Sequence, residues 1–284
     1  MRCPPGFVVR WLPVVLLCLC LPACTSLLQS RTERTLALAR AHGLQSIVLH
    51  KGGFSLLALF KKTTSPTPLL VIYVEGDGVA WLDRSRLSPD PTPRDPLVLR
   101  LMVQDPNPAV GYLGRPCQYA EEGVHACPDR YWSSHRYAPE VVAAMGAAID
   151  QMKEHLQSAE IGLVGYSGGG TVAALLAAER RDVRWLITIA ANLDVAAWTR
   201  HHQVSPMPHS ANPVDVADRL GPIPQWHFVG AEDERVPEVV LQSYLSHLPS
   251  PNAATLQRVS RMDHECCWEK AWPALLAQVP FRRE

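Results

Sequence analysis

Hydrophobic positions in this chain fall into two patterns: short continuous apolar runs and longer stretches with helical spacing. A short run of branched apolar residues is typical of a buried strand, and apolar residues three or four positions apart indicate an amphipathic helix. The predicted strands span residues 46–50, 54–60, 69–74, 109–113, 161–164, 183–190, 226–229 and 255–260. The predicted helices span residues 32–41, 96–103, 139–156, 171–179, 237–247 and 268–276.

The order of these elements indicates the fold class. In the second half of the chain strands alternate with helices, which favours an α/β fold, with a mostly parallel sheet flanked by helices on both faces. Residues 84–96 and 205–224 are rich in proline and are expected to be connectors, because proline breaks helices and central strands. Residues 117–136 are expected to form a polar and aromatic loop. The length suits one domain, which we place at residues 24–284.

The first two dozen residues have the composition of an export signal. Arg2 and Arg10 give a basic start, and residues 11–21 are almost wholly apolar. This apolar run is shorter than the roughly 20 residues that a helix needs to cross a bilayer. A basic start, a short apolar run and a small residue before a break are typical of a signal peptide, which we place at residues 1–23. An N-terminal membrane anchor is the alternative.

The end of this segment, Leu21-Pro22-Ala23-Cys24, resembles the lipobox of bacterial lipoproteins. The resemblance implies that Cys24 is acylated and becomes the new N-terminus, so that its acyl chains hold the protein on a membrane. Thr25 follows, and the lack of Asp at this place in Gram-negative lipoproteins permits sorting to the outer membrane. The expected location is therefore the cell envelope, at the periplasmic face of the outer membrane. A soluble periplasmic protein is the alternative.

One glycine-rich segment carries the pattern of a catalytic serine. Gly165-Tyr166-Ser167-Gly168-Gly169 fits G-x-S-x-G and lies between a predicted strand and a predicted helix, as that motif requires. The serine must project from a sharp turn, which needs small neighbours, and the amides of the following helix can stabilise negative charge. A phosphate-binding loop is disfavoured because no Gly-Lys-Ser/Thr follows. A strand-to-helix turn without a catalytic role is the alternative.

A serine hydroxyl needs a base, and the base needs an acid to orient it. His264 follows the last predicted strand and precedes the last helix, which makes it the expected base among 11 histidines. Asp233 follows strand 226–229 and is the expected acid. Asp194, which follows strand 183–190, is its rival, so the sequence leaves the choice of acid open. Glu232 and Asp263 are lesser rivals for the role of the acid. In the alternative interpretation of Asp263, this residue is a local partner for Arg261.

The oxyanion of an acyl-transfer reaction needs two backbone amides. Gly168, the residue after the nucleophile, is expected to supply one. The segment Glu75-Gly76-Asp77-Gly78 follows strand 69–74 and resembles the His-Gly loop of lipases and esterases, with Glu in place of His. The resemblance implies that the amide of Asp77 is the second donor, with Gly78 as the next choice. Because a carboxylate near an oxyanion is unfavourable, Glu75 is expected to point away and to bond within the loop or to a basic residue.

Together these motifs resemble the α/β-hydrolase superfamily from about Leu69 to the C-terminus, and, with Leu21–Cys24, uncharacterised bacterial lipoprotein hydrolases. The resemblance implies an eight-stranded sheet, acyl-enzyme chemistry on Ser167, Asp233 and His264, and no cofactor. The predicted function is an exported serine hydrolase that cleaves a carboxylic ester or related acyl bond of a small or lipid-like substrate. A peptidase or acyltransferase with the same triad, and a catalytically silent binding protein of the envelope, are the alternatives.

Charge and cysteine content add two constraints. The formal net charge is zero, so no basic surface favours a nucleic acid partner. Cys117, Cys127, Cys266 and Cys267 remain beyond the signal and can pair in three ways in an oxidising compartment. A Cys117–Cys127 disulfide would close a short loop and leave the other two as a vicinal bridge or as free thiols. Paired C-x-x-C motifs do not occur, so no metal site is expected.

Overall fold

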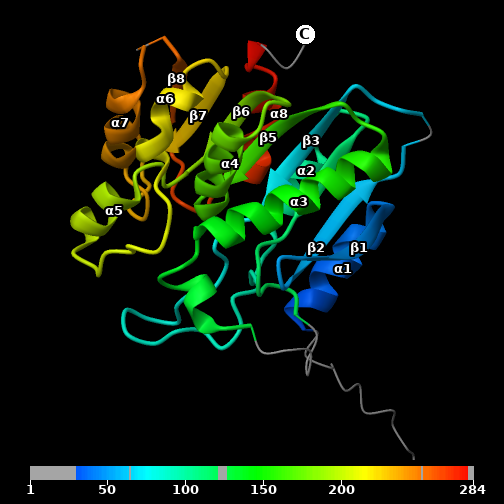
Figure 1. The fold of residues 1–284 in the computed structure, drawn as a ribbon, viewed down its shortest axis with the longest axis horizontal. Coiled ribbons are helices and arrows are strands. Elements are labelled where there is room, and N and C mark those ends of the chain that lie inside the picture. The colour runs from blue at the N-terminus through cyan, green and yellow to red at the C-terminus, as the bar shows by residue number, and fades with distance from the viewer. Residues whose placement is uncertain (1–29, 64, 121–126, 251, 281–284) are drawn as a thin grey trace, which may run out of the picture.

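The computed structural model describes residues 30–63, 65–120, 127–250 and 252–280. The predicted signal peptide, residues 1–23, and the predicted acylation site Cys24 lie outside the described residues. The described part of the chain builds one eight-stranded sheet with helices on both of its faces (Figure 1). The predicted α/β class and the mostly parallel sheet are therefore confirmed.

The sheet has the strand order β1-β2-β4-β3-β5-β6-β7-β8. Strand β2 runs antiparallel to both of its neighbours, and all the remaining pairs are parallel. The strands are β1 (Leu44–Lys51), β2 (Phe54–Lys61), β3 (Leu69–Val74), β4 (Val110–Leu113), β5 (Glu160–Tyr166), β6 (Val183–Ile189), β7 (Gln225–Gly230) and β8 (Ala254–Val259).

Two separate hydrophobic clusters fill the two faces of the sheet. One face is covered by α1 (Arg31–Ala41), α2 (Leu97–Val103) and α8 (Trp268–Leu276). The other face is covered by α3 (Pro139–Leu156), α4 (Gly168–Glu179), α6 (Ala217–Leu220) and α7 (Glu238–His247), of which α3 and α4 cross the sheet in Figure 1. Helix α5 (Val195–His202) packs beside α7. Within the described ranges, no helix combines the length and the apolar content that a membrane span requires.

The local sequence explains why the central elements form. Strand β3 lies between two covered faces, and its apolar residues from Leu70 to Val74 are fully buried. Helix α3 begins at Pro139, whose missing N–H costs nothing in the first turn of a helix. Its Val142, Met145 and Ile149 are spaced three or four residues apart and pack into the same cluster.

Several helical segments differ from the prediction. Helix α4 begins at Gly168 rather than at residue 171, because its glycines pack against the ends of neighbouring strands although glycine is a poor helix former. Helix α5 was not predicted, and neither were the short η2 (Pro213–Val216) and α6 in the Pro-rich connector. Their polar, interrupted sequences hide the helical spacing, and packing against α4 and α7 stabilises them.

The loop after β4 contains the predicted disulfide. Cys117 and Cys127 are joined, with 5.5 Å between their Cα atoms, which confirms this pairing. The same loop includes the short 3-10 helix η1 (Asp129–Trp132). Tyr131 packs edge-on against Phe54 of β2, with 4.8 Å between the ring centroids. The disulfide joins two positions within the loop, and the aromatic contact holds the loop against β2.

Candidate active site

Three strand ends bring the predicted site residues to one edge of the sheet. Val74, the last residue of β3, pairs with Leu113 of β4 on one side and with Gly165 of β5 on the other. The loops that follow β3, β4 and β5 therefore start side by side, at the carboxyl end of the sheet. Strands β7 and β8 end at the same edge and are followed by Asp233 and His264. This edge is where parallel α/β sheets place their ligand sites.

Ser167 lies on a sharp turn between β5 and α4. Its φ and ψ angles are 51° and −125°, in a region that side-chain-bearing residues rarely occupy. The backbone N–H of Ser167 donates to the carbonyl oxygen of Ile189, 2.9 Å away. A Cβ atom on Gly165 would lie 2.5 Å from the carbonyl oxygen of Gly169, so the turn has no space for a side chain at that position. The sequence G-x-S-x-G thus gives the half-buried, conformationally strained serine on a sharp turn that its pattern predicts.

The imidazole of His264 lies between Ser167 and Asp233. Its Nε2 is 3.0 Å from the Ser167 Oγ, and its Nδ1 is 2.9 Å from the Asp233 Oδ2. His264 is only 8% exposed and the side chain of Asp233 is fully buried. The three side chains therefore form one continuous hydrogen-bonded chain, in which the serine hydroxyl can donate to Nε2 while Nδ1–H donates to the carboxylate.

The acid that contacts His264 is Asp233. Its second oxygen, Oδ1, accepts hydrogen bonds from the backbone amides of Arg235 and Val236 at 2.9 and 2.8 Å, which fixes the carboxylate toward the imidazole. The rival Asp194 is the N-cap of α5, where it accepts from the amide of Ala197 and from the hydroxyl of Ser243. Asp194 is thus engaged elsewhere, and the sequence alone left this choice open.

The two lesser rivals also lie away from this contact. Glu232 is exposed. Asp263 is bonded within its own loop, where its Oδ1 accepts from the amides of Glu265 and Cys266 at 2.7 and 2.6 Å. The amides of its own turn are therefore the partners of Asp263, whereas the alternative interpretation paired it with Arg261.

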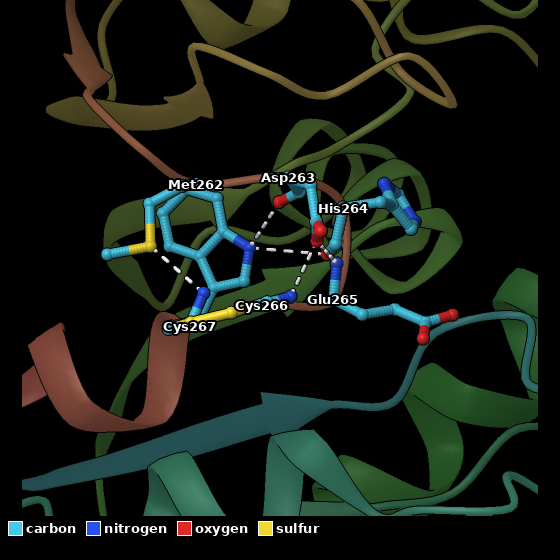
Figure 2. The surroundings of a disulfide bond; sticks show 7 residues. Met262, Asp263, His264, Glu265, Cys266 and Cys267 are labelled. Carbon is cyan, nitrogen blue, oxygen red and sulfur yellow. Dashed lines mark hydrogen bonds between the residues drawn. A yellow bond between two sulfur atoms is a disulfide. The ribbon is translucent and has the colours of Figure 1, made fainter.

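The loop that carries His264 is fixed from several directions. The hydroxyl of Tyr166 and the indole N–H of Trp268 donate to the carbonyl oxygen of His264, at 2.8 and 3.2 Å. Cys266 and Cys267, shortly after His264 in the chain, form a vicinal disulfide (Figure 2). Of the two alternatives that the sequence allowed, a vicinal bridge or free thiols, the structure has the bridge. The backbone around the imidazole is thus held by contacts to β5, to α8 and within the loop itself.

Two backbone amides, one in the loop after β3 and one at the start of α4, have no acceptor in the described part of the chain. The side chain of Glu75 accepts a hydrogen bond from the backbone amide of Gly76, at 2.8 Å. The amides of Asp77 and Gly168 donate to no acceptor among the described residues. A Cβ atom on Gly168 would lie 2.1 Å from the Asp77 Oδ1, so the two residues are in direct contact. Gly78 has a φ of 63° and packs tightly against the carbonyl oxygen of Pro91, so this position has no space for a side chain.

Glu75 points away from the serine, as expected, and bonds within its loop. Its Oε2 accepts a hydrogen bond from the hydroxyl of Tyr112 at 2.9 Å, and this hydroxyl lies 2.5 Å from that of Tyr119. Burial raises the pKa of Glu75 to about 7, because the loss of hydration outweighs the hydrogen bonds from Gly76 and Tyr112. Tyr119 is itself buried and therefore belongs to this network rather than to the rim of a pocket.

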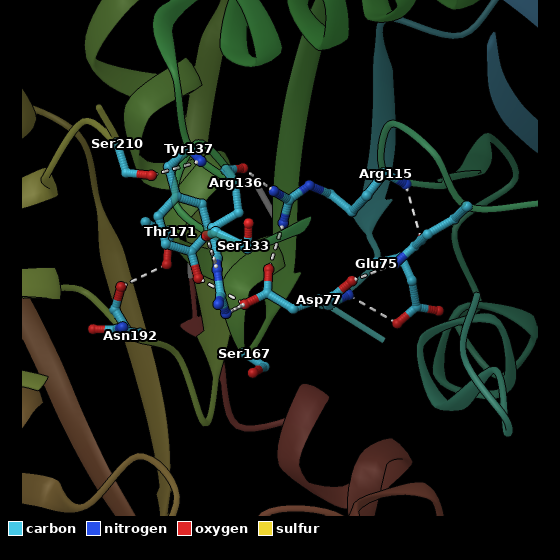
Figure 3. A network of polar contacts seen from close by, with 12 residues as sticks. Glu75, Asp77, Arg115, Ser133, Arg136, Tyr137, Ser167, Thr171, Asn192 and Ser210 are labelled. Atoms are coloured by element: carbon cyan, nitrogen blue, oxygen red, sulfur yellow. Dashed lines mark hydrogen bonds and ion pairs between the residues drawn. The ribbon is translucent and has the colours of Figure 1, made fainter. Parts of the chain in front are cut away.

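Residues that the motifs did not indicate surround the side chain of Asp77 (Figure 3). Its carboxylate is paired with Arg115 at 3.2 Å and with Arg136 at 2.9 Å, and it accepts from the hydroxyl of Tyr137 at 2.8 Å. Burial alone would raise the pKa of Asp77, but the charges of Arg136 and Arg115 hold it below its ordinary value. Both arginines come from the loop region between β4 and α3, where a single arginine gives no local signal.

Across the described ranges, no group of three or more histidine, cysteine, aspartate or glutamate residues is placed to hold a metal ion. The side chains that meet around Ser167 are instead those of an acid–base relay, His264 and Asp233, with the ion-paired cluster at Asp77 next to them. This arrangement supplies a nucleophile, a base and backbone amides.

Comparisons with known proteins show which solved structures this fold resembles. No known family model matches the sequence, and no curated protein matches it. The structure is similar to Est1E from Butyrivibrio proteoclasticus, with a TM-score of 0.57 at 14% identity over 84% of this chain and 99% of that one. It is similar to the α/β hydrolase GrgF from a Penicillium species, with a TM-score of 0.61 at 14% identity over 84% and 97% of the two chains. An esterase of Pyrococcus furiosus gives a TM-score of 0.59 at 13% identity over 99% and 96%. The chain has the α/β-hydrolase fold.

Proposed function

We propose that this protein is a serine hydrolase that cleaves a carboxylic ester or a related acyl bond. The observation that carries the proposal is the continuous relay from the Ser167 Oγ through His264 to Asp233, with contacts of 3.0 and 2.9 Å. The serine at its end sits on a positive-φ turn at the carboxyl edge of the sheet. Esterases from Butyrivibrio proteoclasticus and Pyrococcus furiosus share the fold, which is consistent with this chemistry.

The geometry suggests a two-step acyl transfer. The Ser167 oxygen attacks the substrate carbonyl while His264 Nε2 takes the hydroxyl proton, and Asp233 stabilises the resulting imidazolium. The amides of Gly168 and Asp77 then bind the oxyanion, since neither donates to another described residue. His264 returns the proton to the leaving alcohol, which departs and leaves an acyl-serine. A water molecule, deprotonated by His264, hydrolyses this ester and restores the serine.

Turnover of reporter esters tests the proposal. Purified protein should release p-nitrophenol from short-chain esters, and the dependence on acyl length should begin to define the substrate. The Ser167→Ala and His264→Ala variants should lose about a thousandfold or more of kcat, since a triad acts as a unit. Ser205→Ala, at an exposed serine of the connector after α5, is the matched control and should retain activity. Wild-type protein that is folded but turns over no ester would instead favour the silent binding protein.

We also propose that the chain is exported and anchored through acylated Cys24. The supports are the short apolar run of residues 11–21 and the lipobox-like Leu21–Cys24. Multiple acyl chains on one cysteine would hold the protein stably on a membrane. The mass of the mature protein tests this directly: cleavage before Cys24 with added lipid is expected, and Cys24→Ser should release the chain from membranes. A mature N-terminus without lipid would contradict the anchor.

A further inference from the structure

The cluster around Asp77 contains an excess of positive charge. Arg115 and Arg136 both pair with the one carboxylate of Asp77, and the guanidinium of Arg115 also donates to the backbone carbonyl oxygen of Arg136. The side chains of Arg115, Arg136 and Asp77 are 4%, 11% and 18% exposed. Arginine stays protonated in proteins, so two buried guanidinium groups share a single negative charge.

The other acidic group nearby, Glu75, forms no ion pair with either arginine, although burial raises its pKa and the charge of Arg115 opposes this rise. Glu75 is bonded to the amide of Gly76 and to the hydroxyl of Tyr112. In addition, the Nε of Arg115 is buried and has no hydrogen-bond acceptor among the described residues. Buried charges are normally paired and their donors satisfied, because an unpaired one is costly. A further anion would complete this cluster.

The cluster adjoins the nucleophile. The Asp77 carboxylate touches Gly168, the residue directly after Ser167, because a Cβ atom there would lie 2.1 Å from Oδ1. Figure 3 shows Ser167 in the same view as Asp77 and its ion-paired partner Arg136. Tyr137 is 1% exposed, whereas Asp77 and Arg136 each retain some accessible surface. A molecule bound at Ser167 can therefore reach these two residues first.

We infer that the site takes acyl substrates that carry an anionic group, a carboxylate or a phosphate, and that Arg136 binds this group with Arg115 supporting it from behind. The inference deepens the proposed hydrolase function and rests on it. The planar fork of an arginine matches the oxygens of either anion. Asp77 positions both guanidinium groups and reduces their combined charge to one, which a single substrate anion neutralises.

Matched esters test this inference. One p-nitrophenyl ester has an acyl chain ending in a carboxylate, a second ends in the neutral amide of the same length, and a third ends in a phosphate. Wild-type protein should show a kcat/KM about tenfold to a hundredfold higher for an anionic ester than for the amide. The third ester shows which of the two anions the site prefers. The Arg136→Gln variant should bring this ratio close to one, and Arg136→Lys should restore part of it.

Arg184→Gln is the control for loss of a positive charge, because Arg184 lies near the opposite end of β6 in an exposed pair with Glu160. It should leave the ratio unchanged. If Arg136→Gln fails to fold, inhibition of neutral-ester turnover in the wild type tests the anion site instead. Glutarate should inhibit at least tenfold more strongly than its diamide. Calorimetry with the Ser167→Ala variant measures glutarate binding without any chemistry.

The outcomes separate the two proposals. A wild-type ratio near one, or equal loss for both esters in Arg136→Gln, would overturn the anion site and leave Arg136 as a positioning residue of the Asp77 loop, while ester hydrolysis itself would stand. No turnover of any ester and no serine labelling would overturn the hydrolase instead. Preferential binding of glutarate by Ser167→Ala would then still support an anion site at this edge.

Discussion

The Oε1 atom of Glu75 lies 2.8 Å from the backbone nitrogen of Gly76, and this hydrogen bond determines which amide of the loop stays free. Because Gly76 is engaged, Asp77 provides the first unpaired amide after β3. The buried carboxyl also has a stability consequence. Its pKa is 4.5 in the unfolded reference and about 7 in the folded protein, so the folded state binds this proton more tightly.

The first prediction is therefore an unusual dependence of stability on pH. The contribution of Glu75 to the free energy of unfolding is complete below pH 4.5 and is lost as the pH rises to about 7. A pKa shift of this size corresponds to a loss of about 3 kcal/mol in the free energy of unfolding. The Glu75→Gln variant lacks this titration, so chemical denaturation at pH 5 and pH 8 should show a smaller decline than in the wild type. Equal declines in both proteins would contradict the buried, protonated carboxyl.

The second prediction separates the two aspartates. Asp233→Asn should lower kcat by about ten-thousandfold, because the amide would favour the wrong imidazole tautomer. Asp194→Ala should keep kcat within a few fold of wild type and cost about 1 kcal/mol of stability, because it removes the side-chain oxygen that caps α5. Ester kinetics and urea unfolding of the two variants measure this contrast. A reversal, with activity lost only at Asp194, would show that the contact of 2.9 Å between Asp233 and His264 is not the functional one.

The third prediction concerns acid unfolding. His227 is fully buried between the hydroxyl of Thr188 and the side chain of Gln225, and burial lowers its pKa to about 3. Since the folded-state pKa is depressed, the neutral ring stabilises the fold above pH 6.5, and this contribution is lost as the pH falls toward 3. His227→Gln should flatten the fall in unfolding free energy between pH 6.5 and pH 4. An unchanged slope would show that His227 does not carry this linkage.

The fourth prediction concerns the disulfide in the loop after β4. The bond joins residues ten positions apart, and removing such a link costs roughly 2–4 kcal/mol. Cys117→Ser together with Cys127→Ser should lower the melting temperature by several degrees in a scanning-calorimetry experiment. The effect should be on stability first, because neither cysteine contacts Ser167, His264 or Asp233. A variant with an unchanged melting temperature would show that the loop is ordered without the bond.

Local patterns were sufficient for some of these features and not for others. The bounds of β3 and α3 follow from a continuous apolar run and from Pro139 at a helix start, both of which are read within a few residues. Ser167, Asp233 and His264 each follow a predicted strand closely, so their meeting at one edge follows from the parallel topology. The helix α5 was missed although Asp194 precedes it as a cap, because it is short, with 8 residues, and its second half is polar.

The cluster around Asp77 shows where sequence reasoning stops. Its ion pairs join residues 38 and 59 positions apart, and no spacing rule connects an acid in one loop with two arginines in another. Glu75 has the expected partner within its loop, the amide of Gly76, but its second partner, Tyr112 of the neighbouring strand β4, was not predicted. Such contacts depend on the register of β3 and β4, which hydrophobic patterning alone does not set.

The most direct test of the central claim is covalent labelling of the folded protein with a fluorophosphonate, followed by intact-mass and peptide mass spectrometry. We expect one adduct per chain, on the peptide that contains Ser167. The Ser167→Ala variant should form no adduct, and His264→Ala should be labelled much more slowly. Labelling should persist in the Ser205→Ala control. Folded wild-type protein that forms no adduct, or an adduct on another serine that survives in Ser167→Ala, would contradict the claim that His264 and Asp233 activate Ser167.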